Sequence, residues 1–189
     1  MVPKTISDGL AATRMISRTK WLRWLVLAVI ALGGGWLAYD LASDPGPPTL
    51  EQYLAYAPGR SMAPPGYTID GEPTTCGKVQ VVLNPSLDDV AAAHPGFIIL
   101  NPKRMEALPR VVRLYAFGHE CGHQLHGVSE EMADCYAVTR GQAQGWLDPV
   151  GVEAICAFWK PYAGDNKHLP GLERCELMRR CFSNASAVK

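Results

Sequence analysis

Phe117-Gly-His-Glu-Cys-Gly-His123 contains two histidines four residues apart, within a segment of helical pattern. On a helix, residues four apart differ by only about 40° around the axis, so both imidazoles can reach one tetrahedral metal ion. Glu120 lies beside them, where its carboxylate could take a proton from a water polarised by zinc. The stretch therefore predicts a helix that carries a zinc site, with His119 and His123 as ligands and Glu120 as the catalytic base.

A third protein ligand is expected shortly after this helix. Ser129 is a typical N-cap, and Glu130 and Asp134 share one face of the helix that it would open. We predict that Glu130 binds zinc and that Asp134 orients a ligand histidine, with Glu131, turned about 100° away, as the alternative ligand. The competing explanation is a chance motif followed by an acidic first helical turn, which the helix dipole favours in any protein.

The spacing between the two parts of this site is short. Only six residues lie between His123 and Glu130, so the chain must turn sharply, and Gly127 makes such a turn feasible. Cys121 is a tempting zinc ligand, but on the helix it projects about 200° from His119. We therefore assign it to packing or to a disulfide.

The surrounding sequence predicts a small α+β domain. Residues 79–83 and 96–100 are short, β-branched and bounded by Pro or Asn, which is typical of strands. The pattern then becomes helical, with Pro109 as the expected first position of the motif helix and Gly127 as its stop. Further helices are expected over residues 129–145, 148–159 and 170–182. We predict that the folded domain comprises residues 75–189.

The N-terminal part of the chain predicts a membrane anchor. A basic segment, residues 1–20, precedes an apolar run, residues 21–39, that is long enough to cross a bilayer as one helix and has aromatic residues at both ends. The basic flank should stay in the cytoplasm and the remainder should face the periplasmic or extracellular side. A cleaved signal peptide would need small residues before a cut, and a buried core helix would leave Arg23 without an obvious partner.

Composition adds three expectations. Residues 40–74 are dense in Pro and Gly, which favours an extended, unpacked spacer. All six cysteines lie beyond the apolar run, and an even number in a small exported domain favours disulfides. Lys plus Arg and Asp plus Glu are equal at 18 each, so net charge gives no reason to expect a nucleic-acid partner.

Residues from about 96 to 174 resemble the gluzincin metallopeptidases, particularly their minimal and M48-like members. In these proteins an HExxH motif is followed by a Glu-x-x-x-Asp helix, and the pairs His119/His123 and Glu130/Asp134 match the two motifs. The resemblance implies a zincin-like fold and hydrolysis of peptide bonds by zinc-activated water. Glu120 would act as base and then pass the proton to the leaving amine.

The same resemblance gives roles to three further parts of the chain. The segment 97–100 resembles the edge strand along which a peptide substrate lies extended. His168 would donate a hydrogen bond to the oxyanion of the reaction, the alternative being a histidine of a surface loop. Arg174 is expected to form an ion pair with an acidic residue of the ligand helix.

The function predicted from all of this is a membrane-anchored zinc metalloprotease acting on exported or envelope proteins. One rival is a zinc hydrolase that acts on a non-peptide amide, which would share the ligands but lack the substrate-binding edge strand. Another is a non-catalytic, disulfide-stapled binding module whose metal site is structural or absent.

Overall fold

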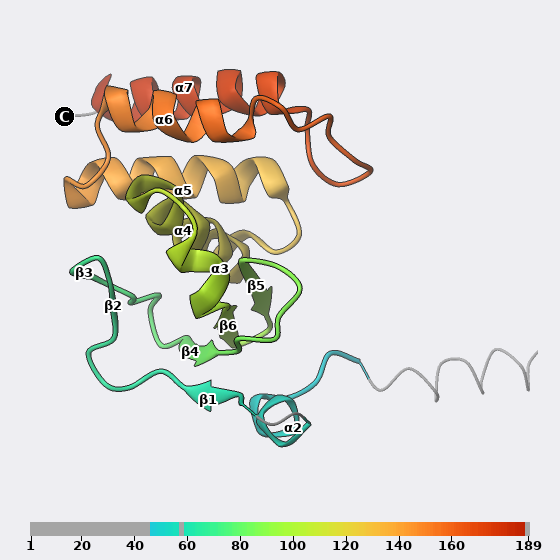
Figure 1. Cartoon of the computed structure of the whole chain (residues 1–189). Helices are drawn as coiled ribbons and strands as arrows, with labels where there is room; N and C mark the ends of the chain where they lie inside the picture. Colours follow the sequence, from blue (N-terminus) through green and yellow to red (C-terminus); the bar gives the residue numbers. More distant parts are fainter. Residues whose placement is uncertain (1–45, 57–58, 188–189) are drawn as a thin grey trace, which may run out of the picture. The chain divides into compact units, whose positions relative to one another are not determined.

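The structure is a computed structural model, and it describes residues 46–56 and 59–187 (Figure 1). From Pro47 onward the chain forms one compact unit. The predicted cytoplasmic segment 1–20 and anchor 21–39 lie outside the described residues. Within the part that is described, none of the helices has the length and apolarity that crossing a bilayer requires.

The described chain has an α+β architecture, as predicted. Its helices are α2 (Leu50–Ala55), α3 (Pro102–Glu106), α4 (Arg110–His126), α5 (Glu130–Gln144), α6 (Pro149–Trp159) and α7 (Gly171–Ala187). Its strands are β1 (Ser61–Met62), β2 (Thr68–Ile69), β3 (Glu72–Pro73), β4 (Gln80–Leu83), β5 (Ala91–His94) and β6 (Phe97–Leu100). One sheet has four strands in the order β1-β4-β6-β5, and β2 with β3 forms a separate hairpin.

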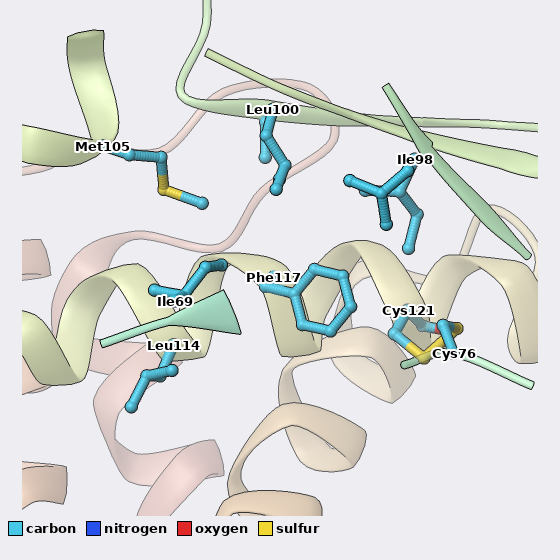
Figure 2. Close-up of a cluster of buried hydrophobic side chains, with 10 residues drawn as sticks. Ile69, Cys76, Ile98, Leu100, Met105, Leu114, Phe117 and Cys121 are labelled. Atoms are coloured by element: carbon cyan, nitrogen blue, oxygen red, sulfur yellow. A yellow bond between two sulfur atoms is a disulfide. The ribbon is translucent and has the colours of Figure 1, made fainter. Parts of the chain in front are cut away.

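Helix α4 is the central element of the domain, between the four-stranded sheet and the other long helices (Figure 1). Its sheet-facing side places Leu114 and Phe117 against Ile98 and Leu100 of β6 (Figure 2). Its opposite side contributes Val112 to a second core shared with α5, α6 and α7. This burial on two sides holds the motif helix firmly in the domain, because apolar side chains on both of its faces are removed from water.

The sheet differs from the prediction in the position of its central strand. The segment 97–100, expected at the edge, forms β6 in the interior, where it pairs in parallel with β4 and antiparallel with β5. All four of its residues are buried. A continuous apolar run is typical of a strand covered on both faces, so this segment could not have been an exposed edge. The edge beside β6 is instead β5.

The expected spacer, residues 40–74, is part of the fold over its described range. Strand β1 pairs antiparallel with β4, and Tyr53 of α2 is buried against Phe97 on the face of the sheet opposite α4. Thr49 caps α2 through a capping box. The folded unit therefore begins well before residue 75, and the Pro and Gly residues of this stretch serve its turns instead of keeping it unpacked.

The helix boundaries follow the expected signals closely. Ser129 accepts a hydrogen bond from the backbone of Met132 at the start of α5, and Asp148 caps α6 ahead of Pro149. Pro109 is the N-cap of α4, so the helix begins at Arg110, one residue later than predicted. Helix α7 continues beyond the expected end near residue 182.

Two disulfides are present among the described residues. Cys76 is joined to Cys121, which ties the segment before β4 to the sheet-facing side of α4 (Figure 2), and Cys135 is joined to Cys181, which ties α5 to α7. The assignment of Cys121 away from the metal site is therefore confirmed. Cys156 and Cys175 are buried free thiols.

Candidate metal centre

Helix α5 approaches α4 very closely because small residues line their contact. A Cβ atom added to Gly122 would lie 2.7 Å from the Cα of Ala133, and one added to Gly118 would lie 3.2 Å from the Cα of Ala137. The first distance leaves no room for a side chain on Gly122 unless the backbone shifts, and the second makes a side chain on Gly118 a tight fit. The close contact carries the first turn of α5 toward the histidine side of α4.

The turn between the two helices also orients one of the histidines. Gly127 has φ of 66°, a conformation that glycine adopts without strain, and its N–H donates to the carbonyl of His123. Its own carbonyl lies 2.7 Å from Nδ1 of His123. The predicted sharp turn is thus confirmed. The carbonyl group of Gly127 also fixes the orientation of the His123 imidazole.

Three side chains converge on one point, as the sequence predicts. Nε2 of His119 lies 3.0 Å from Nε2 of His123, and Oε2 of Glu130 lies 3.1 Å from the first of these atoms and 3.5 Å from the second. In a tetrahedral site with bonds of about 2.0–2.1 Å, ligand atoms are about 3.3 Å apart. This group could therefore hold a metal ion.

The hydrogen bonds of the two histidines make a cation chemically suitable here. Nδ1 of His119 faces Asp134 Oδ1 at 2.8 Å, and Nδ1 of His123 faces a carbonyl oxygen. Because the nearest partner of each Nδ1 is an acceptor, each Nδ1 donates a hydrogen bond, and Nε2 is the ring nitrogen that each histidine directs at the rest of the group. Two ring nitrogens and a carboxylate oxygen at these distances need positive charge between them, supplied either by a proton on one Nε2 or by a bound cation.

A buried network holds His119 in this orientation. Arg174 donates from Nε and Nη2 to the two oxygens of Asp134, at 2.6 and 2.7 Å, and the Tyr115 hydroxyl donates to Asp134 as well. Burial alone would raise the pKa of Asp134, but the hydrogen bonds from His119 and Arg174 lower it to about 2. The predicted ion pair between Arg174 and the ligand helix is confirmed, and Asp134 takes its predicted place behind His119.

The negative groups around His119 favour positive charge at this position. Burial by itself would lower the pKa of His119, but Asp134, Glu130 and the charge of Glu120 outweigh it and raise the pKa to about 9. The surroundings that favour a proton on the imidazole in the absence of metal also favour a divalent cation, since both neutralise the same carboxylates.

Glu120 lies beside the group without belonging to it. Its carboxylate lines a cavity of ≈ 190 Å³ together with His119 and His168. Burial raises the pKa of Glu120, the two motif histidines lower it, and Asp89 and Glu130 raise it again, with a net increase. A carboxylate of raised pKa next to a candidate metal site is suited to act as a general base and acid.

The alternative ligand, Glu131, does not reach the site. Its side chain is exposed and lies 3.4 Å from the hydroxyl of Ser129. Glu131 points away from the site because it is one residue beyond Glu130, and one residue along a helix turns the side chain by about 100°.

His168 reaches the site from the loop between α6 and α7. Its Nε2 lies 3.1 Å from Oε2 of Glu130, and its Nδ1 lies 3.1 Å from both carboxylate oxygens of Asp165. Tyr162 donates a hydrogen bond to Asp165 in turn. Like the two motif histidines, His168 has Nδ1 on an acceptor and directs Nε2 toward the centre, so it is not a free surface histidine.

Two groups of this site were missed by sequence reasoning. Tyr115 lies four residues before His119, a spacing that places both on one face of α4 and could have signalled a contact. Asp165 lies three residues before His168 in a loop, where no periodicity links the two side chains. Both act through other residues, by fixing the carboxylate or the imidazole nearest the centre.

The comparisons with known proteins are negative. No protein-family model matches this chain, and no curated protein or solved structure is significantly similar to it. The geometry of the site therefore carries the functional proposal.

Asp134→Ala is expected to lower the free energy of unfolding of the metal-free protein by about 3–5 kcal/mol, because Arg174 would remain buried without its partner. Urea unfolding measures this change. The matched control is Glu153→Ala, which breaks an equally bidentate but exposed pair with Arg179 and should change stability little. Equal losses in the two variants would contradict the importance of the buried pair.

Proposed function

We propose that this chain is a membrane-anchored zinc metallopeptidase with a zincin-like domain. The observation that carries the proposal is the convergence of two imidazole Nε2 atoms and the Glu130 carboxylate on one point, with Glu120 beside it and a cavity lined by His119, Glu120 and His168. His119, His123 and Glu130 would hold the ion, and the fourth position would remain open for water or substrate.

Hydrolysis of a peptide bond at this site would need two main contributors, the bound ion and Glu120. Bound zinc supplies Lewis-acid polarisation of a carbonyl and lowers the pKa of water. Glu120 takes the proton of the attacking water at its carboxylate oxygen and then delivers it to the nitrogen of the leaving amine. Its raised pKa suits both steps, since a group that titrates closer to neutrality accepts and releases a proton more evenly.

His168 would stabilise the developing oxyanion. Its Nε2 lies at the edge of the ligand group, 3.1 Å from Glu130, and it lines the same cavity as Glu120. Asp165 holds the opposite ring nitrogen and so fixes the direction in which Nε2 points. When both ring nitrogens carry a proton, Nε2 is a hydrogen-bond donor held in advance near the reacting carbonyl, and such a donor lowers the barrier without reorganisation during the reaction.

A peptide substrate is favoured over a non-peptide amide by the position of β5. This strand ends the sheet, contacts α4, and begins at Ala91 on the wall of the cavity that contains Glu120. Gln124 of α4 braces the β5–β6 turn by donating to the carbonyl of His94 and accepting from the N–H of Gly96. An extended chain paired with this edge would run past the ligand group.

The location of the enzyme is part of the proposal. Residues 21–39 would anchor the chain in a membrane with its N-terminus in the cytoplasm, and the domain would act on exported or envelope proteins on the periplasmic or extracellular side. The two disulfides support this side, because disulfides persist in oxidising compartments.

Removal of the metal tests the proposal directly. The full chain, purified in detergent and loaded with zinc, should cleave members of a peptide library, lose this activity on treatment with a chelator, and regain it when zinc is added back. Mass spectrometry of the digest and metal analysis provide the two readouts. Cleavage that survives complete metal removal would contradict the mechanism, and a protein that binds no stoichiometric zinc would instead support the binding module.

A further inference from the structure

The cavity beside Glu120 has the dimensions and walls of a pocket for one side chain. Its volume is ≈ 190 Å³, and His119, Glu120 and His168 are among the residues that line it. Much of its wall is apolar, and it comes from Leu108 just before α4, Val112 and Ala116 of α4, and Phe158 of α6. Such a wall favours the methylene or aromatic part of a substrate side chain over water.

The ionisable groups in this wall differ in how well they are neutralised. Arg174 is paired through both of its hydrogen-bonding nitrogens with Asp134, and His168 contacts Asp165 and Glu130. Asp89 is exposed and accepts a hydrogen bond from the backbone of Val90, but within residues 46–56 and 59–187 it has no Lys, Arg or His in ion-pair contact. Glu120 of the same wall also lacks such a partner but is assigned to catalysis, so Asp89 is the remaining unpaired carboxylate among the described residues of this wall.

An apolar wall that leads to an unpaired carboxylate matches one class of side chain. Lys and Arg have long methylene stems that pack on apolar surface and a cationic tip that remains near water. A neutral side chain of similar length would pack against the apolar wall but leave Asp89 without a partner. An acidic side chain would be repelled by Asp89.

We propose that Asp89 makes this cavity a specificity pocket for a Lys or Arg residue next to the scissile bond. The inference rests on the proposed peptidase function and deepens it by naming the substrate class. Asp89 acts here as a specificity-determining residue, and the chemistry of bond cleavage stays with the other groups of the site.

The adjacent residue provides a matched control. Asp88 is also an exposed aspartate in the loop before β5, but it is not part of the cavity wall. Asp89→Asn and Asp88→Asn remove the same charge from neighbouring positions, so any general effect of net charge or loop stability is common to both. Only Asp89→Asn removes the charge from the pocket.

The test compares two peptides that differ at one position, Lys or Met, beside the cleaved bond. The full chain loaded with zinc is assayed for kcat/KM on each. The wild type and Asp88→Asn should favour the Lys peptide by about 10-fold, and Asp89→Asn should reduce this preference to about 1. The preference of the wild type should also fall in 1 M salt, because the carboxylate is exposed to screening. An unchanged Lys-to-Met ratio in Asp89→Asn would overturn the inference.

The assays distinguish a wrong assignment of specificity from a wrong assignment of function. If the wild type cleaves library peptides but shows no preference for basic residues, the specificity inference fails and the peptidase remains. If the zinc-loaded wild type cleaves no peptide at all, the proposed function fails and the inference falls with it. Zinc content and thermal unfolding of Asp89→Asn, expected to equal those of the wild type, show that an altered ratio does not reflect a misfolded variant.

Discussion

Glu120→Gln is expected to reduce kcat for peptide hydrolysis by about 10²–10⁴-fold while leaving zinc content unchanged. The amide has nearly the shape of the carboxylate but cannot take a proton from the attacking water. Because Glu120 is not among the three converging side chains, the metal should stay bound. This combination, with metal retained and activity lost, distinguishes a base from a ligand.

The measurement is a steady-state assay on one cleaved library peptide together with metal analysis of the same sample. Glu106→Gln is a suitable control, because it removes an exposed carboxylate at the end of α3 that lies outside the cavity wall. It should leave both quantities unchanged. Loss of zinc in Glu120→Gln would show that this carboxylate is a ligand, and retained activity would remove its role as base.

Glu130→Gln is expected to weaken zinc binding by more than the roughly 10- to 100-fold that is typical of losing an outer-shell partner. The carboxylate contributes the only formal negative charge among the three ligands. A neutral amide oxygen in its place would leave two imidazoles and weaker electrostatic attraction for a dication. Peptidase activity should fall in proportion to the metal lost, and added zinc should recover part of it.

Glu131→Gln is the matched control for this experiment. The two glutamates are adjacent at the start of α5, so both variants change the charge near the helix N-terminus by the same amount. Competition with a chromophoric chelator gives the zinc affinity of each. Equal losses would indicate an effect of the helix dipole, and a larger loss in Glu131→Gln would reverse the ligand assignment.

The local parts of the site could be predicted from sequence. Two histidines at helical spacing, a glycine at the turn and a serine cap before a pair of acidic residues each act within a few positions, and the structure has them as expected. The distance from His123 to Glu130 depends on a single turn at Gly127, so few backbone conformations can connect the two helices. The exclusion of Cys121 followed from helix geometry alone.

The non-local parts could not be predicted in the same way. Strand order depends on hydrogen bonds between segments distant in sequence, and β5, which begins with three alanines, has little strand propensity to mark it as the edge. Strand β1 is only two residues long, too short for a periodic pattern, so the Pro- and Gly-rich stretch before residue 75 resembled a spacer. Its order comes from pairing with β4.

The partners of Asp134 illustrate the same limit. A contact between Arg174 and some acidic residue of the ligand helix was expected, but nothing local identified which one. The choice is made by the packing of α7 on α5, which brings the guanidinium to Asp134 across 40 positions of sequence. Tyr115 joins the pair because α4 presents it one turn before His119.

The glycines at the crossing of α4 and α5 have a consequence for the choice of ion. Two of the proposed ligands belong to one helix and the third to the other, so we expect the radius of the ion that fits to depend on how closely the two backbones approach at Gly118 and Gly122. Wider separation would suit larger cations with more oxygen ligands. Redesign of metal preference should therefore begin at the helix crossing, away from the residues that touch the metal.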